Sequence, residues 1–210
     1  AEIASAPVTT LSDLLRYVQG VDIRQRGANG VQADISVRGG TFDQVLILLN
    51  GVNITDPQTG HHNLNLPIDL SVIERIEILQ GPGSRVLGPN AFSGAINIIT
   101  GNADKNAVHV NLSAGDYGYI SQAADATVKS GGLTSFASFS HSRSEGYKEN
   151  TDFDMTNAFL QLRYDSKLFG ALNLQSGYQD KGFGAYGFYS AAYPDEYEQT
   201  RTFFASLSSE

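Results

Sequence analysis

The sequence predicts a chain that is mostly β overall, with an α+β domain over about residues 1–102 and long antiparallel strands over residues 103–210. Two observations lead to this fold class. The first part is irregular and rich in glycine, with one evident helix and several short apolar strands. In the second part polar and apolar residues alternate over long segments, which is typical of strands with one apolar face.

The composition excludes several classes of function. A formal net charge of -8 argues against nucleic acid as a partner. The sequence has no cysteine, and therefore no disulfide, thiolate metal site or cysteine nucleophile. It contains no G-x-S-x-G or H-E-x-x-H motif, so we expect no enzyme activity, no catalytic residue and no cofactor. No apolar run approaches the roughly 20 residues of a membrane-spanning helix.

Local signals place the elements of the first part. Thr10 is placed to cap a helix, and Asp13 follows three residues later, as in a capping box. Gly20 is expected to end this helix. Strands are expected over residues 34–39, 44–49, 52–54, 74–79 and 95–100, with a helical turn near residues 68–73. Asn50 and Gly51 between two apolar runs predict a tight hairpin.

The glycine-rich loop 81–88 has the appearance of a phosphate-binding turn, but neither known motif is complete. Val86 stands where a dinucleotide fingerprint needs its third glycine, and Pro89 and Asn90 replace the lysine and hydroxyl of a P-loop. A β-branched strand rather than a helix is expected next. We therefore interpret the loop as a connection between strands. The residues expected to serve structural turns are Gly39, Asn50, Gly51, Gly81, Pro82, Gly83, Gly88 and Gly94.

Strand length and connection length suggest how the second part folds. In residues 157–164, Ala158, Leu160, Leu162 and Tyr164 alternate with polar neighbours. The strand cores run to about ten residues, the length of a tilted strand that crosses a bilayer. Connections 130–132 and 165–167 are short, whereas 143–154 and 180–199 are long, polar and rich in tyrosine. This asymmetry favours an outer-membrane barrel, and a soluble β-sandwich is the alternative.

Two stretches resemble a known family. "SVRGGTFDQVLILLNGVNITDPQTG" and "IERIEILQGPGSRVLGPNAFSGAINIIT" resemble the plug domain of TonB-dependent outer-membrane receptors, over roughly residues 11–100. The resemblance implies a bacterial outer-membrane location and contact with outer-membrane lipid. It also implies pairing with TonB through a segment upstream of this chain and a small-molecule or metal-chelate substrate, and it leaves room for a surface lipoprotein as a further partner.

The sequence departs from the family pattern in ways that matter. Nothing in "AEIASAPVTT" resembles the TonB-pairing motif, and about six strands cannot close a barrel of 22 strands. We therefore expect a fragment, with the plug in residues 1–102 and the first six or so barrel strands in 103–210. Gln80 replaces a family arginine. Plug arginines of the family are thought to pair with barrel carboxylates, and Arg38, Arg75 and Arg85 are the candidates here.

The implied function is TonB-dependent uptake of a scarce, bulky nutrient, a siderophore, cobalamin or a glycan, with the plug gating the barrel lumen. The loop "DPQTGHHN" favours cobalamin. The candidates for ligand contact are Asp56, Gln58, His61, His62 and Asn63. Adjacent residues of an extended chain point in opposite directions, so His61 and His62 are not expected to share a metal ion.

Other functions remain open from the sequence. A signalling or adhesion receptor of the same architecture is one alternative, and a soluble β-rich binding protein is another. Acidic residues in 149–157 and 193–198 would suit calcium, but neither segment has the spaced ligands and the glycine of a calcium loop.

Overall fold

The computed structural model describes residues 6–101, 105–166, 170–190 and 192–209. The chain forms two compact units. The first comprises the chain up to residue 65 together with residues 73–101, and the second comprises residues 66–72 and the chain after residue 101. The expected boundary between residues 102 and 103 lies outside the described residues, so that division stays a prediction. No helix in the described ranges is long and apolar enough to cross a membrane.

The first unit begins with the predicted helix, α2 (Leu11–Leu15). The Thr10 hydroxyl accepts a hydrogen bond from the amide of Asp13 at 3.1 Å and donates one to the Asp13 carboxylate at 2.7 Å. These contacts confirm the expected N-cap, since they satisfy an amide that has no partner within the helix. The helix ends at Leu15 with Arg16 as its C-cap, so the expected stop at Gly20 is wrong. The Val18 amide donates to the Leu15 carbonyl in a tighter turn, and Gly20 follows it at φ +81°.

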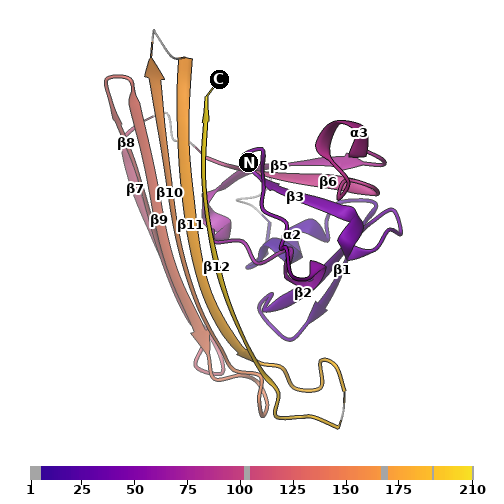
Figure 1. Ribbon diagram of the computed structural model, residues 1–210. Helices are drawn as coiled ribbons and strands as arrows, with labels where there is room; N and C mark the ends of the chain where they lie inside the picture. The colour runs from indigo at the N-terminus through magenta and orange to yellow at the C-terminus, as the bar shows by residue number, and fades with distance from the viewer. Residues whose placement is uncertain (1–5, 102–104, 167–169, 191, 210) are drawn as a thin grey trace. The chain divides into compact units, whose positions relative to one another are not determined.

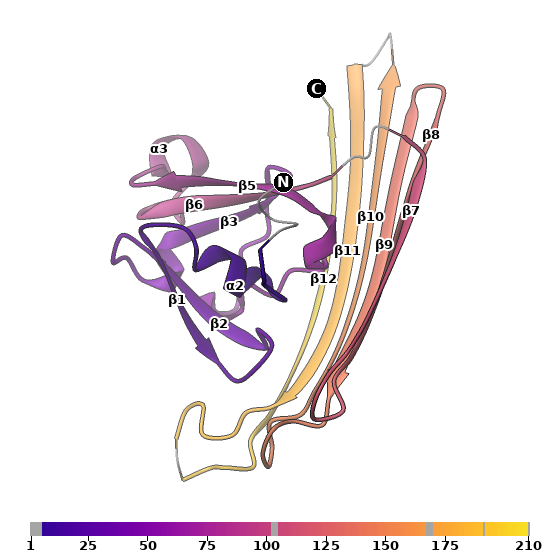
Figure 2. The same cartoon turned by 180° about the vertical axis from the view of Figure 1, so that it is seen from behind.

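A four-stranded sheet forms the centre of the first unit (Figure 2). Its strands, in spatial order, are β4 (Val52–Asn53), β3 (Val45–Leu49), β6 (Gly94–Thr100) and β5 (Ile73–Gln80). Strands β3 and β6 are parallel and the other neighbours are antiparallel. All five residues of β3 are buried, as are Ile96 and Ile98 of β6, so these two strands carry the core.

A second, two-stranded sheet in this unit pairs β1 (Val21–Arg26) with β2 (Gln32–Val37). The sequence predicts a strand at β2 but gives no prediction of a strand at β1. Strand β1 alternates only weakly, with Ile23 as its one buried residue, so it gives little periodic signal.

The hairpin between β3 and β4 confirms the prediction made from Asn50 and Gly51. Both residues have positive φ, 49° and 81°, as a type I′ turn requires. The Asn50 side chain donates to the Thr100 hydroxyl at 3.0 Å and accepts from the Thr100 amide at 2.9 Å. The turn residue therefore also ties the hairpin to the end of β6.

The glycine-rich loop connects β5 to β6, as expected, but it contains a short helix that the sequence analysis did not anticipate, α3 (Ser84–Leu87). The amides of Gly81 and Gly83 donate to the carbonyls of Ser93 and Ala91 at 3.0 and 2.8 Å. The two arms of the loop are thus joined to each other. These amides are engaged within the chain, which agrees with a structural role.

The second unit is built on one six-stranded antiparallel sheet (Figure 1). The strands lie in chain order: β7 (Ala107–Ala114), β8 (Ile120–Ser130), β9 (Leu133–Ser144), β10 (Phe153–Ser166), β11 (Gly170–Gly184) and β12 (Tyr197–Ser209). Segment 66–72, which contains the 3-10 turn η3 (Leu70–Val72), belongs to the same unit.

One face of this sheet is apolar and open. Val108, Val110 and Leu112 of β7 have exposed fractions of 73%, 68% and 72%. The same face continues across the sheet through Leu160 of β10 to Leu207 of β12, which is 74% exposed. A soluble sandwich would bury these side chains against a second sheet. The arrangement is that of a barrel wall, and it confirms the fold class predicted from the alternating pattern.

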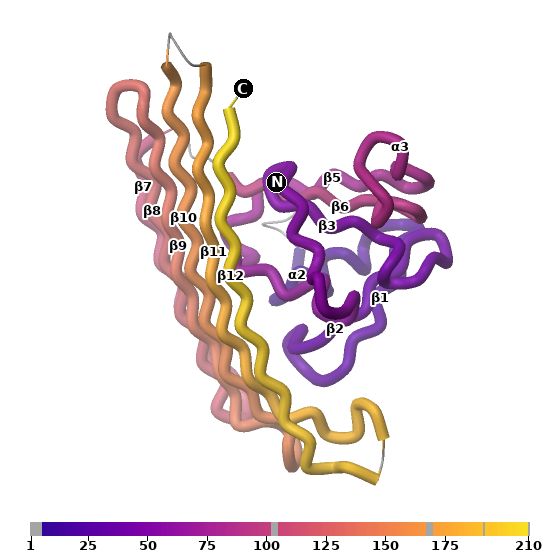
Figure 3. The backbone as a smooth tube through the Cα atoms, viewed as in Figure 1, coloured from indigo at the N-terminus to yellow at the C-terminus, as the bar shows by residue number. Residues whose placement is uncertain are grey.

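The opposite face of the sheet is mostly polar, with buried Ser140, Asn157 and Gln179 side by side on neighbouring strands. Connections 115–119 and 145–152 and the described residues of the next one, 185–190 and 192–196, gather at one end of the strands, and the short turn 131–132 lies at the other (Figure 3). The expected turn over residues 165–167 includes residue 167, which lies outside the described residues.

Candidate functional site: the loop after the β3–β4 hairpin

The five candidate ligand-contact residues lie in one loop, residues 54–63, which follows β4 and contains the 3-10 turn η2 (Gly60–His62). Asp56 organises its first half, because the carboxylate accepts from the amides of Gln58 at 2.8 Å and Thr59 at 3.0 Å. The Thr59 hydroxyl then caps η2 by accepting from the amide of His61 at 3.4 Å. Short polar side chains that bond their own backbone fix the loop in this way.

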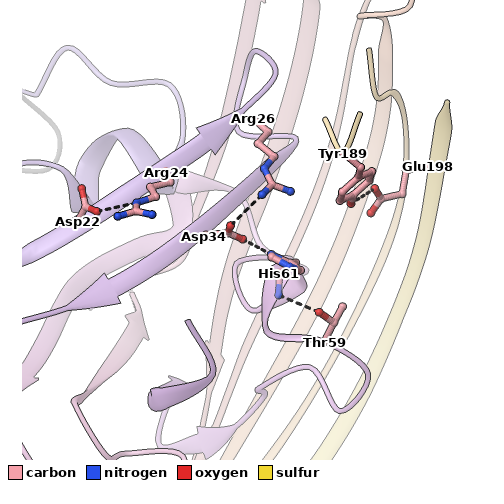
Figure 4. A network of polar contacts seen from close by, with 8 residues as sticks. All are labelled: Asp22, Arg24, Arg26, Asp34, Thr59, His61, Tyr189 and Glu198. Atoms are coloured by element: carbon pink, nitrogen blue, oxygen red, sulfur yellow. Dashed lines mark hydrogen bonds and ion pairs between the residues drawn. The ribbon is translucent and has the colours of Figure 1, made fainter. Parts of the chain in front are cut away.

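A polar network fixes the second half of the loop (Figure 4). His61 Nδ1 lies 2.6 Å from Asp34 Oδ1, and the other Asp34 oxygen lies 3.8 Å from Arg26 Nη2. The Asp34 side chain is only 12% exposed. The His61 ring also packs against Phe42, with 4.2 Å between the ring centroids. The imidazole therefore joins the loop to β2 and to the 3-10 turn η1 (Phe42–Gln44).

Asn63 is a buried residue whose side chain forms hydrogen bonds with the backbone of the loop and of η1. It is 1% exposed, donates to the Phe42 carbonyl at 3.1 Å and accepts from the Asp56 amide at 3.1 Å. At Gly60 a Cβ atom would lie 2.4 Å from both Asp43 Oδ1 and Phe42 Cδ2, so a larger residue would not fit without movement. The loop is a pre-formed structure, and its shape depends on side chains that are also candidates for ligand contact.

The candidates thus divide into two groups. Asp56, His61 and Asn63 make the hydrogen bonds that shape the loop. Gln58 is exposed at the tip, and His62 is partly exposed. Contact of any of them with a ligand stays a prediction, and Gln58 has the most accessible position for it.

Sequence reasoning missed the residues that support the loop. Asp34, Arg26 and Phe42 lie 27, 35 and 19 positions from His61, too far for a local pattern to connect them. One signal was available. Asp34 is a carboxylate inside the buried strand β2, and a buried charge requires a partner.

The three arginines predicted to pair with barrel carboxylates occupy different settings in the first unit. Arg75 Nε lies 2.9 Å from Glu77 Oε1 and its Nη1 lies 3.1 Å from Glu74 Oε1. The hydrogen bond to Glu77 raises the pKa of Arg75. Arg38 and Arg85 are exposed, and Arg38 has a positive φ of 50°. Pairing of these arginines with barrel carboxylates stays a prediction.

The predicted turn residues differ in their settings, and Gly94 lies in strand β6 rather than in a turn. Gly39, Gly51, Gly81 and Gly88 have positive φ, together with Asn50; Gly83 and Gly94 are tightly packed, and Pro82 is exposed. At Gly94 a Cβ atom would lie 2.6 Å from the carbonyl oxygen of Leu79 on the neighbouring strand.

The long connections of the second unit form another ordered polar surface. Asn150 donates from Nδ2 to the carbonyls of Pro194 and Glu196, each at 2.7 Å, and so joins connection 145–152 to 185–196. Lys148 Nζ lies 3.7 Å from the centroid of the Tyr186 ring. Exposed tyrosines lie on both connections, including Tyr147 and Tyr189 at 54% and 55%. In the described part of the chain, no group of three or more histidine and acidic side chains is placed to hold a metal ion.

Comparison with known proteins decides the family. Residues 1–95 match the family model described as the TonB-dependent Receptor Plug Domain. Residues 1–95 of this chain form a plug domain of the TonB-dependent receptor family. The plug lies in the first part of the sequence, and the six-stranded sheet follows as barrel wall. The family consists of receptors and transporters rather than enzymes, and the chain is accordingly a protein of the Gram-negative outer membrane.

Individual relatives extend the similarity beyond the plug. The chain is 29% identical over 200 residues to the vitamin B12 transporter BtuB of Vibrio vulnificus, which covers 93% of this chain and 29% of that relative. The chain therefore spans less than a third of that protein's length. Among solved structures, the copper transporter OprC matches 96% of this chain and 32% of its own, with a TM-score of 0.74 at 18% identity. The FrpB iron transporter of Neisseria meningitidis matches 96% of this chain and 35% of its own, with a TM-score of 0.74 at 17% identity. These two similarities establish the fold alone.

Proposed function

We propose that this receptor performs TonB-dependent uptake of a scarce, bulky nutrient across the outer membrane, and that the nutrient is a cobalamin. The observation that carries the proposal is the similarity to a vitamin B12 transporter over 93% of this chain, across both the plug and the wall strands. A vitamin B12 transporter BtuB of Vibrio cholerae is 34% identical to this chain over 130 residues.

Each part of the chain has a role in this proposal. The plug blocks a barrel that is too wide to be filled by its own side chains. The apolar face of β7–β12 contacts lipid, as the exposure of Val108, Val110 and Leu207 supports. TonB acts on a segment that precedes the plug in the family, and it supplies the energy for plug movement. In this proposal the exposed amide of Gln58 contacts the substrate from the plug side.

Uptake of labelled cyanocobalamin tests the proposal. The receptor is expressed in a Gram-negative strain that lacks its own cobalamin receptor, and accumulation is measured with and without TonB. We expect accumulation that requires both the receptor and TonB. A ferric siderophore taken up in the same way, without cobalamin uptake, would reassign the substrate and keep the transport mechanism. Absence of TonB-dependent uptake for both nutrients would refute the proposal.

A further inference from the structure

Segment 66–72 interrupts the first unit along the chain. Residues up to 65 and from 73 to 101 belong to the first unit, but the seven residues between them belong with the sheet of the second. Leu66, Pro67, Ile68 and Val72 of this segment are buried. A short piece of chain with both flanks in the plug is therefore packed on the wall sheet. We call residues 66–72 the strap.

Three strands contribute to a row of hydrogen bonds that ends on the strap. Gln179 of β11 donates from Nε2 to the Leu66 carbonyl at 2.8 Å and to Asn157 Oδ1 of β10, also at 2.8 Å. Asn157 in turn donates from Nδ2 to the Ser140 hydroxyl of β9 at 3.1 Å. Ser140, Asn157 and Gln179 are 4%, 5% and 3% exposed. Buried polar groups bonded in series hold one another in place, because breaking one bond leaves groups that water cannot easily reach.

The orientation of the Gln179 amide is determined by its partners. The Leu66 carbonyl can only accept, so the nitrogen of Gln179 must face it. The groups in this row are also uncharged at neutral pH, so neither pH nor salt would release the strap through them.

Shape provides a second, independent observation. Gly177 lies two residues before Gln179 in β11, on the same face of the strand. A Cβ atom at Gly177 would lie 2.6 Å from Pro67 Cγ and 2.5 Å from Phe204 Cε1. The proline ring of the strap therefore occupies the space that the missing side chain leaves open. Hydrogen bonding at Leu66 and close packing at Pro67 fix two consecutive strap residues on β11.

We infer that Gly177 and Gln179 are positioning residues that keep the strap anchored on the wall sheet throughout transport, while the plug chain on either side of it moves. The part of this inference that concerns transport rests on the proposed function. The anchoring of the strap does not rest on the proposed function, because the same contacts are expected in the resting receptor.

A disulfide between the strap and β11 tests the anchor. The ideal Cβ position at Gly177 lies 3.1 Å from Pro67 Cβ, close to the roughly 3.5–4.5 Å that a disulfide needs, and the sequence has no other cysteine. We expect Pro67→Cys with Gly177→Cys to cross-link in most copies of the intact receptor in resting outer membranes. The matched control is Pro67→Cys with Tyr178→Cys, because Tyr178 points to the opposite face of β11 and cannot reach the strap. Absence of a cross-link in folded receptor would overturn the anchor.

Transport by the cross-linked receptor tests whether the anchor is permanent. We expect the oxidised, cross-linked variant to take up cobalamin at a rate within about twofold of the rate of the same variant after reduction. Uptake that stops on oxidation and returns on reduction would show that the strap must leave the wall, and would overturn the inference. Failure of the proposed function is distinguishable, since the reduced variant and the unmodified receptor would then both lack uptake while the cross-link still formed.

A second variant avoids any change of packing at Gly177. Gln179→Leu keeps most of the side-chain volume but removes the donor to Leu66. We expect amide exchange in the strap to rise about tenfold or more in the intact receptor, with little change for Gln122→Leu, which alters an exposed glutamine of β8. Equal exchange in both variants would show that the hydrogen bond does not hold the strap.

Discussion

At the scale of single residues, the loop 54–63 shows that its most conspicuous polar side chains support its shape. The pair Asp34 and His61 is the clearest case, with 2.6 Å between oxygen and nitrogen in a setting that is mostly shielded from water. Hydrogen bonds to carboxylates contribute about 1.5–3 kcal/mol. We predict that Asp34→Ala lowers the free energy of local opening by about that amount and raises amide exchange in residues 56–63 by roughly tenfold or more. Exchange mass spectrometry measures this.

Asp22→Ala is the matched control for that substitution. Asp22 lies on the neighbouring strand, also pairs with an arginine, and is 64% exposed. Exposed ion pairs contribute little, so the exchange of the loop should stay unchanged. A similar increase in both variants would mean that the His61 contact does not hold the loop.

Gln58 separates contact with a ligand from support of the loop. Its side chain is exposed, whereas Asp56 beside it bonds the backbone of the loop. We predict that Gln58→Ala weakens cobalamin binding about 2–10-fold, the value of one hydrogen bond, and leaves amide exchange unaltered. Asp56→Ala should change both. Isothermal titration and exchange on the same preparations distinguish the two roles, and unchanged binding in Gln58→Ala would remove Gln58 from the contact surface.

At the scale of elements, the sequence predicts structure well wherever the signal is local. Thr10 with Asp13, and Asn50 with Gly51, act over three residues or fewer, and both motifs form as expected. Strands of the second unit alternate over their whole length and are also found. The helix inside the glycine loop is missed because four residues are too few to give a periodic signal. The placement of residues 66–72 with the wall sheet is missed because it depends on distant partners. The support of His61 by Asp34 belongs to the same class.

Gly94 provides a test of the β5–β6 pairing. A methyl group there would meet the Leu79 backbone oxygen at 2.6 Å and Val37 Cγ1 at 2.9 Å, and backbone yields less easily than the end of a side chain. We predict that Gly94→Ala destabilises the plug by about 1–3 kcal/mol, the usual cost of overpacking, and makes it susceptible to protease in intact receptor. Gly115→Ala is the control, because its added methyl group would be in ordinary contact at 3.5 Å from Tyr119. Equal resistance of the two variants would contradict the prediction.

Across the whole wall sheet, one face carries the apolar side chains and the other face carries mostly polar ones. Val108 and His109 of β7 are neighbours that point to opposite faces. Val108 is 73% exposed and lies in register, through Ala126 and Ala137, with Leu160 in the middle of β10. His109 faces the other way, with Nδ1 2.7 Å from Asp125 Oδ2. One position therefore lies on the open apolar face of the sheet, and the next lies on its polar face.

Arginine placed at each of these positions tests the assignment of the faces. Arginine that faces lipid near the bilayer centre costs about 2–4 kcal/mol, so Val108→Arg should lower the fraction of receptor that assembles in bilayers. The folded fraction is measured at increasing urea concentrations as the intensity of the electrophoretic band that shifts on heating. His109→Arg places the same charge one residue away, opposite the Asp125 carboxylate, and should assemble like the unmodified protein. The sign of the difference is decisive, because reversed faces would make His109→Arg the damaging change, and a water-exposed sheet would tolerate both.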